Sequence, residues 1–516
     1  MTDVRTATLA LLRDLGMTTV FGNPGSTELP MFRDFPSDFR YVLGLQESVV
    51  LGMADGYAQG TGRAALVNLH ATAGTGHALG NLFTAYKNQT PLVITAGQQA
   101  RSILPFEPFL FAERPTEFPR PFVKWAVEPA RAADVPGAIA RAWMVAMQPP
   151  CGPTFVSIPI DDWEQPCDPV QVPRMGAANP GDPALLAEAA ARLAGAARPA
   201  LVLGAGVARD GGWHQAIALA ERHQAPVYVA PFSARCSFPE DHPLFAGFLE
   251  PRREAIVAAL ADHDLIIALG GPMNLYHVEG AGPHLPPGAT VVFIADNPAQ
   301  VSWAPCDLAI VADARHALSA LLAGPAPAGR TPPPPRASIP LETALTDRWL
   351  LDRVAALRPA GAIIVEEAPT ARGPMHDHLP ITAPNSFYTC ASGGLGHGLP
   401  AAIGLALAQP QRKVIALLGD GSTMYAIQGL WSAAQMGLPV SFVILNNQRY
   451  EALRGFGRLF GMQTVAGTDL TGLDFCGLAA AQGLAARRVA DLGDLDAALA
   501  WSFANAAPTL VEVMIA

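Results

Sequence analysis

Two polar motifs in the last third of the chain could together bind a metal ion. Asp420, in the run GDGS, and Asn447, in the run NN, each follow an apolar stretch that predicts a β-strand, at 414–418 and at 440–445. A helix is predicted between them over 426–436, which completes a strand, helix, strand unit. The carboxyl ends of parallel strands share one sheet edge, so the carboxylate and the amide oxygen are expected to converge on one hard cation such as Mg²⁺.

The residues around Asp420 also suit a phosphate group. Gly419 and Gly421 let the backbone pass close to a ligand, and Ser422 and Thr423 open a helix whose N-terminus attracts anions. Either motif alone would be an ordinary turn or loop. Their placement after neighbouring strands predicts a site for Mg²⁺ and a diphosphate.

GDGS followed by NN at this spacing resembles the metal and diphosphate motif of thiamine diphosphate-dependent enzymes. The resemblance implies that the metal is held by Asp420, by Asn447 and by the main-chain carbonyl of Arg449. The residues that it implies for the diphosphate, beside Gly421 above, are Thr370, Ser422 and Tyr425.

Two further segments match the part of this family that holds the other end of the cofactor. The cofactor supplies the electron sink, and the protein positions it and places a carboxylate on its aminopyrimidine ring. The run ESVVLGMADGYA resembles the helix that begins with this glutamate, here Glu47, although alone Glu47 would be an ordinary first-turn acid. The run GGLGHGLP resembles the segment that accepts the pyrimidine amino group, which implies the carbonyl of Gly393, and that wedges the cofactor into a bent form, which implies Leu395.

Three polar residues are candidates for contact with the substrate. Ser26 lies in the turn FGNPGSTE, His70 ends a strand predicted at 64–70, and His277 lies in a loop after a strand predicted at 264–271. Each alone would more often be a helix cap or a surface residue. Together they resemble benzoylformate decarboxylases, and the similarity runs over nearly the whole chain.

This second resemblance implies a reaction, the non-oxidative decarboxylation of benzoylformate, an aromatic 2-keto acid, to benzaldehyde and CO₂ through an enamine on thiamine diphosphate. It implies that Ser26 hydrogen-bonds the substrate carboxylate, that His70 acts near substrate addition and protonates the enamine, and that His277 assists later proton transfer. Histidine suits both proton steps because its pKa lies near working pH. Mandelate degradation, carboligation and a homotetramer with active sites shared between subunits are further implications.

The resemblance also assigns the walls of the site. Asn23, Pro24 and Gly25 are expected beside the cofactor. Phe109 stands where an aliphatic residue is expected, and Pro369 stands where a hydroxyl residue is expected beside Thr370. The apolar substrate pocket is expected from Phe109, Leu110, Leu453 and Phe456.

Two alternative functions stay open at this stage. The first is another thiamine diphosphate decarboxylase or carboligase, of the acetolactate synthase type. The second is a nicotinamide- or flavin-dependent oxidoreductase, because Gly204 and Gly206 in LVLGAG form part of a dinucleotide-binding fingerprint. Arg209 occupies the place of its third glycine, which favours a structural turn.

Composition limits the classes of protein. Lys and Arg number 34 and Asp and Glu number 44, and the resulting charge of −10 opposes broad attraction to nucleic acid or anionic membranes. The six cysteines are scattered without a paired motif, which fits the cytoplasm. No stretch approaches the roughly 20 apolar residues of a membrane span.

Two linkers rich in proline and glycine divide the 516 residues into three parts. The predicted domains are 1–165, which binds the pyrimidine, 183–324, which is central and Rossmann-like, and 341–516, which binds the diphosphate and Mg²⁺. Short β-rich runs alternate with helical patterns in each. The predicted fold class is therefore α/β, with three parallel-sheet domains of the thiamine diphosphate-enzyme type.

Overall fold

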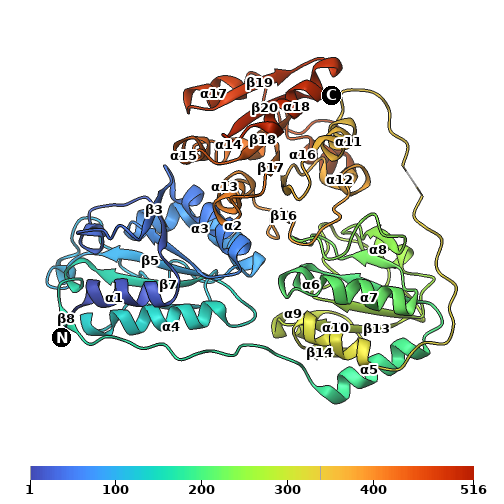
Figure 1. The fold of residues 1–516 in the computed structure, drawn as a ribbon, viewed down its shortest axis with the longest axis horizontal. Coiled ribbons are helices and arrows are strands. Elements are labelled where there is room, and N and C mark those ends of the chain that lie inside the picture. Colours follow the sequence, from blue (N-terminus) through green and yellow to red (C-terminus); the bar gives the residue numbers. More distant parts are fainter. Residues whose placement is uncertain (1, 338, 516) are drawn as a thin grey trace. The chain divides into compact units, whose positions relative to one another are not determined.

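The computed structural model describes residues 2–337 and 339–515, and its main elements are three β-sheets of six strands each (Figure 1). The strand pairs described within these sheets are all parallel, which confirms the predicted fold class. The chain divides into two compact units, one from residues 1–177, 357–370 and 392–516 and the other from 178–356 and 371–391. The domain boundaries stay a prediction.

The N-terminal sheet has the strand order β3-β2-β4-β5-β7-β6. Helices α2 and α3 cover one face, and α1 and α4 cover the other (Figure 1). The strands are β2 (Thr19–Gly22), β3 (Arg40–Leu43), β4 (Ala65–Leu69), β5 (Leu92–Gln98), β6 (Trp125–Val127) and β7 (Thr154–Pro159); the helices are α1 (Val4–Asp14), α2 (Glu47–Thr61), α3 (Ala71–Asn88) and α4 (Val135–Met147). A small antiparallel pair, β1 (Thr2–Asp3) with β8 (Pro166–Cys167), joins the two ends of this part of the chain.

The C-terminal sheet has the order β16-β15-β17-β18-β20-β19. Its strands are β15 (Ile363–Glu367), β16 (Phe387–Thr389), β17 (Val414–Gly419), β18 (Val440–Asn446), β19 (Ala485–Val489) and β20 (Thr509–Met514). The helices of this part of the chain are α11 (Asp347–Leu357), α12 (Arg372–His378), α13 (Gly398–Ala408), α14 (Asp420–Met424), α15 (Gly429–Met436), α16 (Glu451–Leu459), α17 (Phe475–Ala481) and α18 (Leu495–Ala504). The continuous helix predicted over 426–436 was wrong at its start, because α14 and α15 are separated by turns at 425–428.

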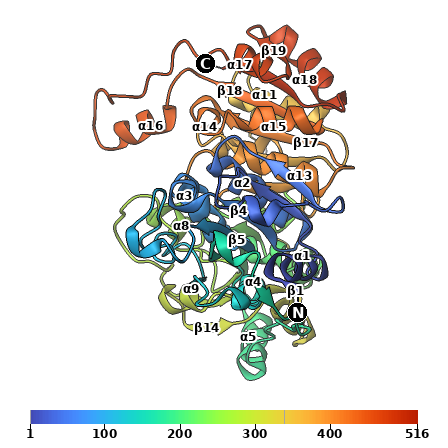
Figure 2. The same cartoon turned by 90° about the vertical axis from the view of Figure 1, so that its left-hand side faces the viewer.

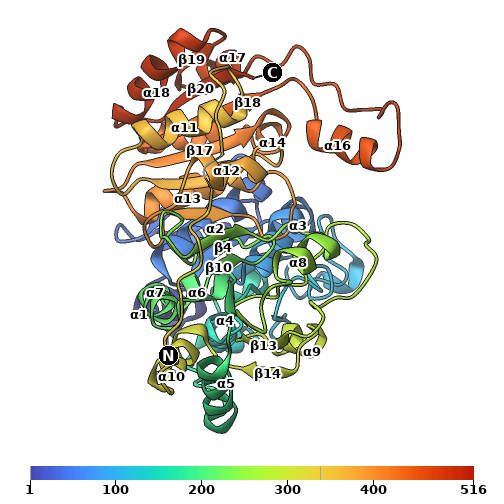
Figure 3. The same cartoon turned by 90° about the vertical axis from the view of Figure 1, so that its right-hand side faces the viewer.

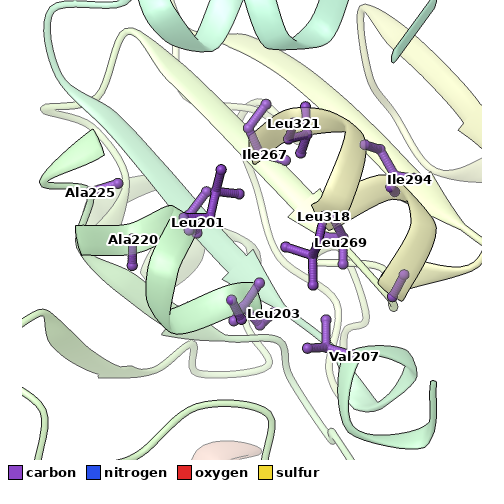
Figure 4. Packing of buried hydrophobic residues seen from close by; sticks show 14 of the residues in the cluster. Leu201, Leu203, Val207, Ala220, Ala225, Ile267, Leu269, Ile294, Leu318 and Leu321 are labelled. Carbon is purple, nitrogen blue, oxygen red and sulfur yellow. The ribbon is translucent and has the colours of Figure 1, made fainter. Parts of the chain in front are cut away.

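The central sheet, in the second unit, has the order β11-β10-β9-β12-β13-β14. Leucine and isoleucine side chains of β9 and β12 pack against α7 and α10 in a buried apolar core (Figure 4). The strands are β9 (Pro199–Leu203), β10 (Val227–Val229), β11 (Phe245–Phe248), β12 (Leu265–Leu269), β13 (Thr290–Ala295) and β14 (Leu308–Val311); the helices are α5 (Pro183–Gly195), α6 (Ala205–Arg209), α7 (Trp213–His223), α8 (Arg253–Ala259), α9 (Pro298–Trp303) and α10 (Ala314–Ala323).

Helices α2 and α13 join the N-terminal and C-terminal sheets within the first unit. Glycines allow their backbones to touch, because a Cβ atom at Gly56 would lie 2.1 Å from the carbonyl oxygen of Ala401 and one at Gly404 would lie 1.9 Å from that of Met53. Helix α2 begins at Glu47 because the side chain of Gln46 accepts hydrogen bonds from the next turn. The contact therefore fixes the helix that carries Glu47 against the C-terminal domain.

This packing predicts that Gly404→Val destabilises the first unit by about 3 kcal/mol, the upper end of ordinary overpacking. Gly80→Ala is the matched control, because Gly80 lies inside α3 with open space where its Cβ would be. The Gly80→Ala substitution should raise the free energy of unfolding by roughly 0.5 kcal/mol. Differential scanning calorimetry of both variants measures the effect, and a Gly404→Val protein as stable as the unmodified chain would contradict the account.

Candidate active site

Asp420 and Asn447 lie at the same edge of the C-terminal sheet. Asp420 directly follows β17, Asn447 directly follows β18, and these strands pair in parallel. The backbone N–H of Arg449 lies 3.2 Å from Oδ2 of Asp420 and 3.2 Å from Oδ1 of Asn447. One amide thus reaches both side-chain oxygens, which places them close together.

A buried network that the sequence reasoning missed holds the turn after β18. Asn446 accepts a hydrogen bond from the backbone of Gln448 at 3.0 Å and donates one to Glu512 at 2.7 Å. Glu512 is fully buried on β20 and also accepts from Arg488 at 2.9 Å. A lone acid inside the apolar run TLVEVM was the only sequence signal. The network fixes the backbone that carries Asn447 and Arg449.

The donors at this edge fit a hard cation with a phosphate ligand. Among the described residues no three His, Cys, Asp or Glu side chains gather as a metal site, so the available oxygens are one carboxylate, one amide and backbone carbonyls. A cation that keeps phosphate or water ligands, as Mg²⁺ does, suits so small a set. Burial raises the pKa of Asp420, although backbone N–H groups, that of Gly421 first, act against the shift.

The residues expected on the diphosphate lie along the same edge. A Cβ at Gly421 would lie 2.1 Å from the ring of Tyr450, so only glycine fits there without a shift. Ser422 is buried in α14, whereas Thr370, in the turn after β15, and Tyr425, after α14, are exposed. The structure therefore places one buried and two exposed hydroxyl groups at the carboxyl ends of β15 and β17.

The segment that contains Gly393 and Leu395 is held by one buried acidic side chain. Glu367, at the end of β15, accepts hydrogen bonds from the backbone of Gly396 at 2.6 Å, of His397 at 2.7 Å and of Gly398. Gly393 has a φ of 73° and is exposed, and Leu395 is half-buried. The turn thus presents both residues while the next three amides are held by a buried carboxylate.

His397 in this turn forms a buried pair with Asp55 of α2. Burial alone would lower the pKa of His397, but the charge and hydrogen bond of Asp55 outweigh it and raise that pKa. Burial alone would raise the pKa of Asp55, but the charge and hydrogen bond of His397 outweigh it and lower that pKa. The pair is an ionic link between the glutamate helix and the turn.

Glu47 lies at the corresponding edge of the N-terminal sheet. It is the first residue of α2, which follows β3, and its side chain is mostly buried. Oε1 lies 3.5 Å from Nδ2 of Asn23, in the loop after β2, and Oε2 lies 3.1 Å from Nδ1 of His77 on α3. Of the residues expected beside the cofactor in this loop, Asn23 and Gly25 are half-buried and Pro24 is exposed.

His70 directly follows β4 at this edge and precedes α3, and a carboxylate that the sequence reasoning missed holds its ring. Nδ1 of His70 lies 2.9 Å from Oε2 of Glu28, whose side chain is 1% exposed. A Cβ at Gly25 would lie 2.0 Å from the same nitrogen, so the ring lies directly on that glycine. With Nδ1 bound by a carboxylate, Nε2 is left for another partner. Ser26 lies in the exposed turn between Gly25 and Glu28.

Glu28 itself is held in a fixed position. It accepts hydrogen bonds from the backbone of Gly25 at 2.9 Å, from the backbone of Gly97 at 3.0 Å and from the hydroxyl of Thr27 at 2.6 Å. A Cβ at Gly97 would lie 2.0 Å from Oε1 of Glu28, which keeps that strand end close. The carboxylate is therefore a rigid anchor for the histidine.

His277 belongs to the second unit, in the loop after β12. Its backbone N–H donates to the carbonyl of Pro251 at 3.0 Å, and its ring lies 5.6 Å from the ring of Phe232 in an edge contact. The side chain is exposed. The structure thus places an accessible histidine at the carboxyl edge of the central sheet.

The residues expected to form the apolar pocket lie on two exposed segments of the first unit. Phe109 is 87% exposed, and Leu110 beside it has a left-handed φ of 64°. Leu453 and Phe456 lie on α16, which stands out from its domain (Figures 2 and 3). Leu453 is exposed and Phe456 is half-buried.

The glycine loop of the central domain uses two of its backbone donors within the fold. The backbone N–H groups of Gly204 and Gly206 donate to the carbonyls of Leu269 and Gly270, each at 2.8 Å. A Cβ at Gly204 would lie 2.6 Å from Cα of Gly271, so the two loops touch. The amides that would bind a pyrophosphate are already used, which argues against the nicotinamide or flavin alternative.

His397→Gln removes the buried pair with Asp55, and we expect this loss to lower the free energy of unfolding by about 3 kcal/mol. The effect should depend on pH. Because the pKa of His397 is raised in the folded state, its contribution is complete below the unfolded value of about 6.5 and is lost as the pH rises through the folded value. The difference in melting temperature between the unmodified chain and the variant should therefore shrink from pH 6 upward. A difference that stays constant or grows would contradict the ionic pair.

Comparisons with known proteins place the whole chain. Three thiamine pyrophosphate (that is, diphosphate) enzyme models match it, the N-terminal TPP binding domain at 2–112, the central domain at 186–321 and the C-terminal TPP binding domain at 370–513. A benzoylformate decarboxylase from Pseudomonas aeruginosa is 44% identical over 99% of both chains.

Two solved structures share the fold over the full length. The benzoylformate decarboxylase of Polynucleobacter necessarius has a TM-score of 0.98 and 40% identity, and covers 100% of this chain and 99% of its own. A thiamine diphosphate-dependent 4-hydroxybenzoylformate decarboxylase from Rhodococcus jostii RHA1 has a TM-score of 0.96 and 40% identity over the same shares. The chain therefore belongs to the thiamine pyrophosphate enzyme family, similar over its whole length to benzoylformate decarboxylases.

Proposed function

We propose that the chain is a thiamine diphosphate- and Mg²⁺-dependent carboxy-lyase that converts benzoylformate, or a close aromatic 2-keto acid, to the aldehyde and CO₂. The observation that carries the proposal is the pairing of His70 with the buried carboxylate of Glu28, beside Ser26 and at the same sheet edge as Glu47. A histidine held in this way can move a proton at a fixed place. The similarity to benzoylformate decarboxylases over the full length supports the substrate class.

The residues at the two sheet edges would hold the cofactor. Bound thiamine diphosphate supplies the electron sink that makes loss of CO₂ possible. Asp420, Asn447 and the carbonyl of Arg449 would hold Mg²⁺, and Glu47 would hold the aminopyrimidine. The other residues proposed for cofactor contact are Asn23, Pro24, Gly25, Thr370, Gly393, Leu395, Gly421, Ser422 and Tyr425.

The remaining polar residues would act on the substrate. Ser26, exposed in its turn, would donate a hydrogen bond to the substrate carboxylate. Nε2 of His70 would deliver and remove a proton near the carbonyl carbon, since Nδ1 is bound by Glu28. His277 would assist the later proton transfer that releases the aldehyde.

The apolar residues suit an aromatic substrate. Phe109, Leu110, Leu453 and Phe456 would surround the aryl group, and the ring of Phe109 would stack on it or narrow the pocket. Preference among ring-substituted arylglyoxylates therefore depends on Phe109. The Rhodococcus relative, by its title, acts on 4-hydroxybenzoylformate, which makes that compound a useful second substrate.

We infer that the active form is a homotetramer with sites shared between subunits. The exposed apolar side chains of Phe106 and Phe109, and of Leu459 and Phe460 at the end of α16, support an assembly that covers them. The six cysteines are scattered along the chain without a paired motif, which supports the cytoplasm as its location. No helix among the described residues is long and apolar enough to cross a membrane. Mandelate-type degradation and a carboligation side reaction belong to the same proposal.

The substrate assignment predicts that Ser26→Ala and His70→Ala each lower turnover by about 10²-fold or more, the usual loss for a positioned acid–base group. The dissociation constant of thiamine diphosphate should stay unchanged, because neither residue is proposed to bind the cofactor. Steady-state kinetics with a cofactor titration measures both quantities. Near-normal turnover of either variant would contradict its role.

A coupled aldehyde-release assay tests the reaction itself. Apo protein reconstituted with thiamine diphosphate and Mg²⁺ is supplied with benzoylformate, 4-hydroxybenzoylformate or pyruvate at matched concentrations. Aldehyde release from the aromatic acids that depends on both additions is the expected result. If pyruvate is consumed and the aromatic acids do not react, the result would favour acetolactate-type chemistry.

A further inference from the structure

His77 contacts Glu47, and this contact has no role in the reaction proposed above. Its Nδ1 lies 3.1 Å from Oε2 of Glu47, while the other carboxyl oxygen faces Asn23. The side chain of Glu47 is 11% exposed and that of His77 is 63% exposed. In the single chain, the imidazole therefore lies between a nearly buried carboxylate and solvent.

Helix α3 fixes His77 in this position. Gly74, His77 and Asn81 are three and four residues apart, so they share one helix face. A Cβ at Gly74 would lie 3.3 Å from Cγ of Glu47, and Nδ2 of Asn81 donates to the carbonyl of Ser48 at 2.7 Å. Contacts one turn before and one turn after His77 thus hold α3 on the first turn of α2.

We propose that His77 is the residue through which Glu47 exchanges its proton with water. The proposal rests on the proposed function, in which Glu47 would hold the aminopyrimidine, and adds that its carboxyl group would give and take a proton there. The O–H bond of Glu47 breaks as a bond from hydrogen to Nδ1 of His77 forms, and the cationic ring then releases its Nε2 proton to water. The same two steps in reverse return a proton to Glu47, so atoms and charge balance.

The alternative role for the contact is to orient Glu47 without moving protons. A glutamine at position 77 distinguishes orientation from proton exchange. The amide of His77→Gln can still donate a hydrogen bond to Glu47, but it cannot take up a proton at neutral pH. A role in orientation alone would survive this change. Proton exchange would not.

The test is the rate at which the thiazolium C2 proton of bound thiamine diphosphate exchanges with D₂O, measured by rapid quench and NMR, together with the dissociation constant of the cofactor. We expect His77→Gln to slow the exchange at least about tenfold, consistent with loss of an acid–base group, with unchanged cofactor affinity. His77→Ala should be equally slow, and added imidazole should restore its exchange.

The matched control is His316→Gln. Nδ1 of His316 lies 2.7 Å from Oδ1 of Asp313, and its side chain is 50% exposed, but this pair belongs to the second unit, where no residue proposed to bind the cofactor lies near it in sequence. Its exchange rate should match that of the unmodified protein. Exchange at the normal rate in His77→Gln, or no rescue of His77→Ala by imidazole, would overturn the proposal.

Glu47→Gln distinguishes a failure of the proposed proton path through His77 from a failure of the proposed role of Glu47. Exchange that persists in Glu47→Gln would refute the proposed role of Glu47 itself. Exchange that is lost in Glu47→Gln and normal in His77→Gln would refute only the proton path. The expected pattern is loss in the first variant and slow exchange in the second.

Discussion

Within one chain, the close packing of α2 on α13 is the constraint that fixes the sheet carrying Glu47 relative to the sheet carrying Asp420. Glycine at positions 56 and 404 lets the two helix backbones touch, and this contact joins the sheet that carries Glu47 to the sheet that carries Asp420. Each helix starts beside a functional segment, since Glu47 is the first residue of α2 and the turn with Gly393 leads into α13. A shift of either helix would therefore displace proposed cofactor residues in both domains.

Buried carboxylates then fix the polar residues around this contact. Glu28 holds the ring of His70, Glu367 holds the amides of the turn before α13, and Glu512 holds Asn446 beside the proposed metal ligand Asn447. Burying an ionised group is costly unless several hydrogen bonds compensate it. Each of these carboxylates has at least two such bonds, so each is a rigid part of the site and its surroundings.

The sequence predicted the fold class and the residues at the sheet edges because those signals are local. Apolar runs that alternate with helical patterns specify parallel α/β layers, and GDGS and NN can be read within a few residues of each strand end. The anchors were missed because they act across the fold. Glu28 lies 42 residues from His70, and Glu512 lies 66 residues from Asn446. The contact between His77 and Glu47, 30 residues apart, was missed for the same reason. The start of α15 at Gly429 packs against a residue 30 positions away, because a Cβ there would lie 2.5 Å from the side chain of Leu399.

A crystal structure of the chain grown with thiamine diphosphate and Mg²⁺ would show whether the sheet edge with Asp420 of one subunit and the sheet edge with Glu47 of another subunit form one cofactor site. We predict a cation bound by Asp420, Asn447 and the carbonyl of Arg449, and an aminopyrimidine ring on the carboxylate of Glu47 from a second subunit. A cation bound elsewhere, or a cofactor whose ring lies away from Glu47, would contradict this prediction.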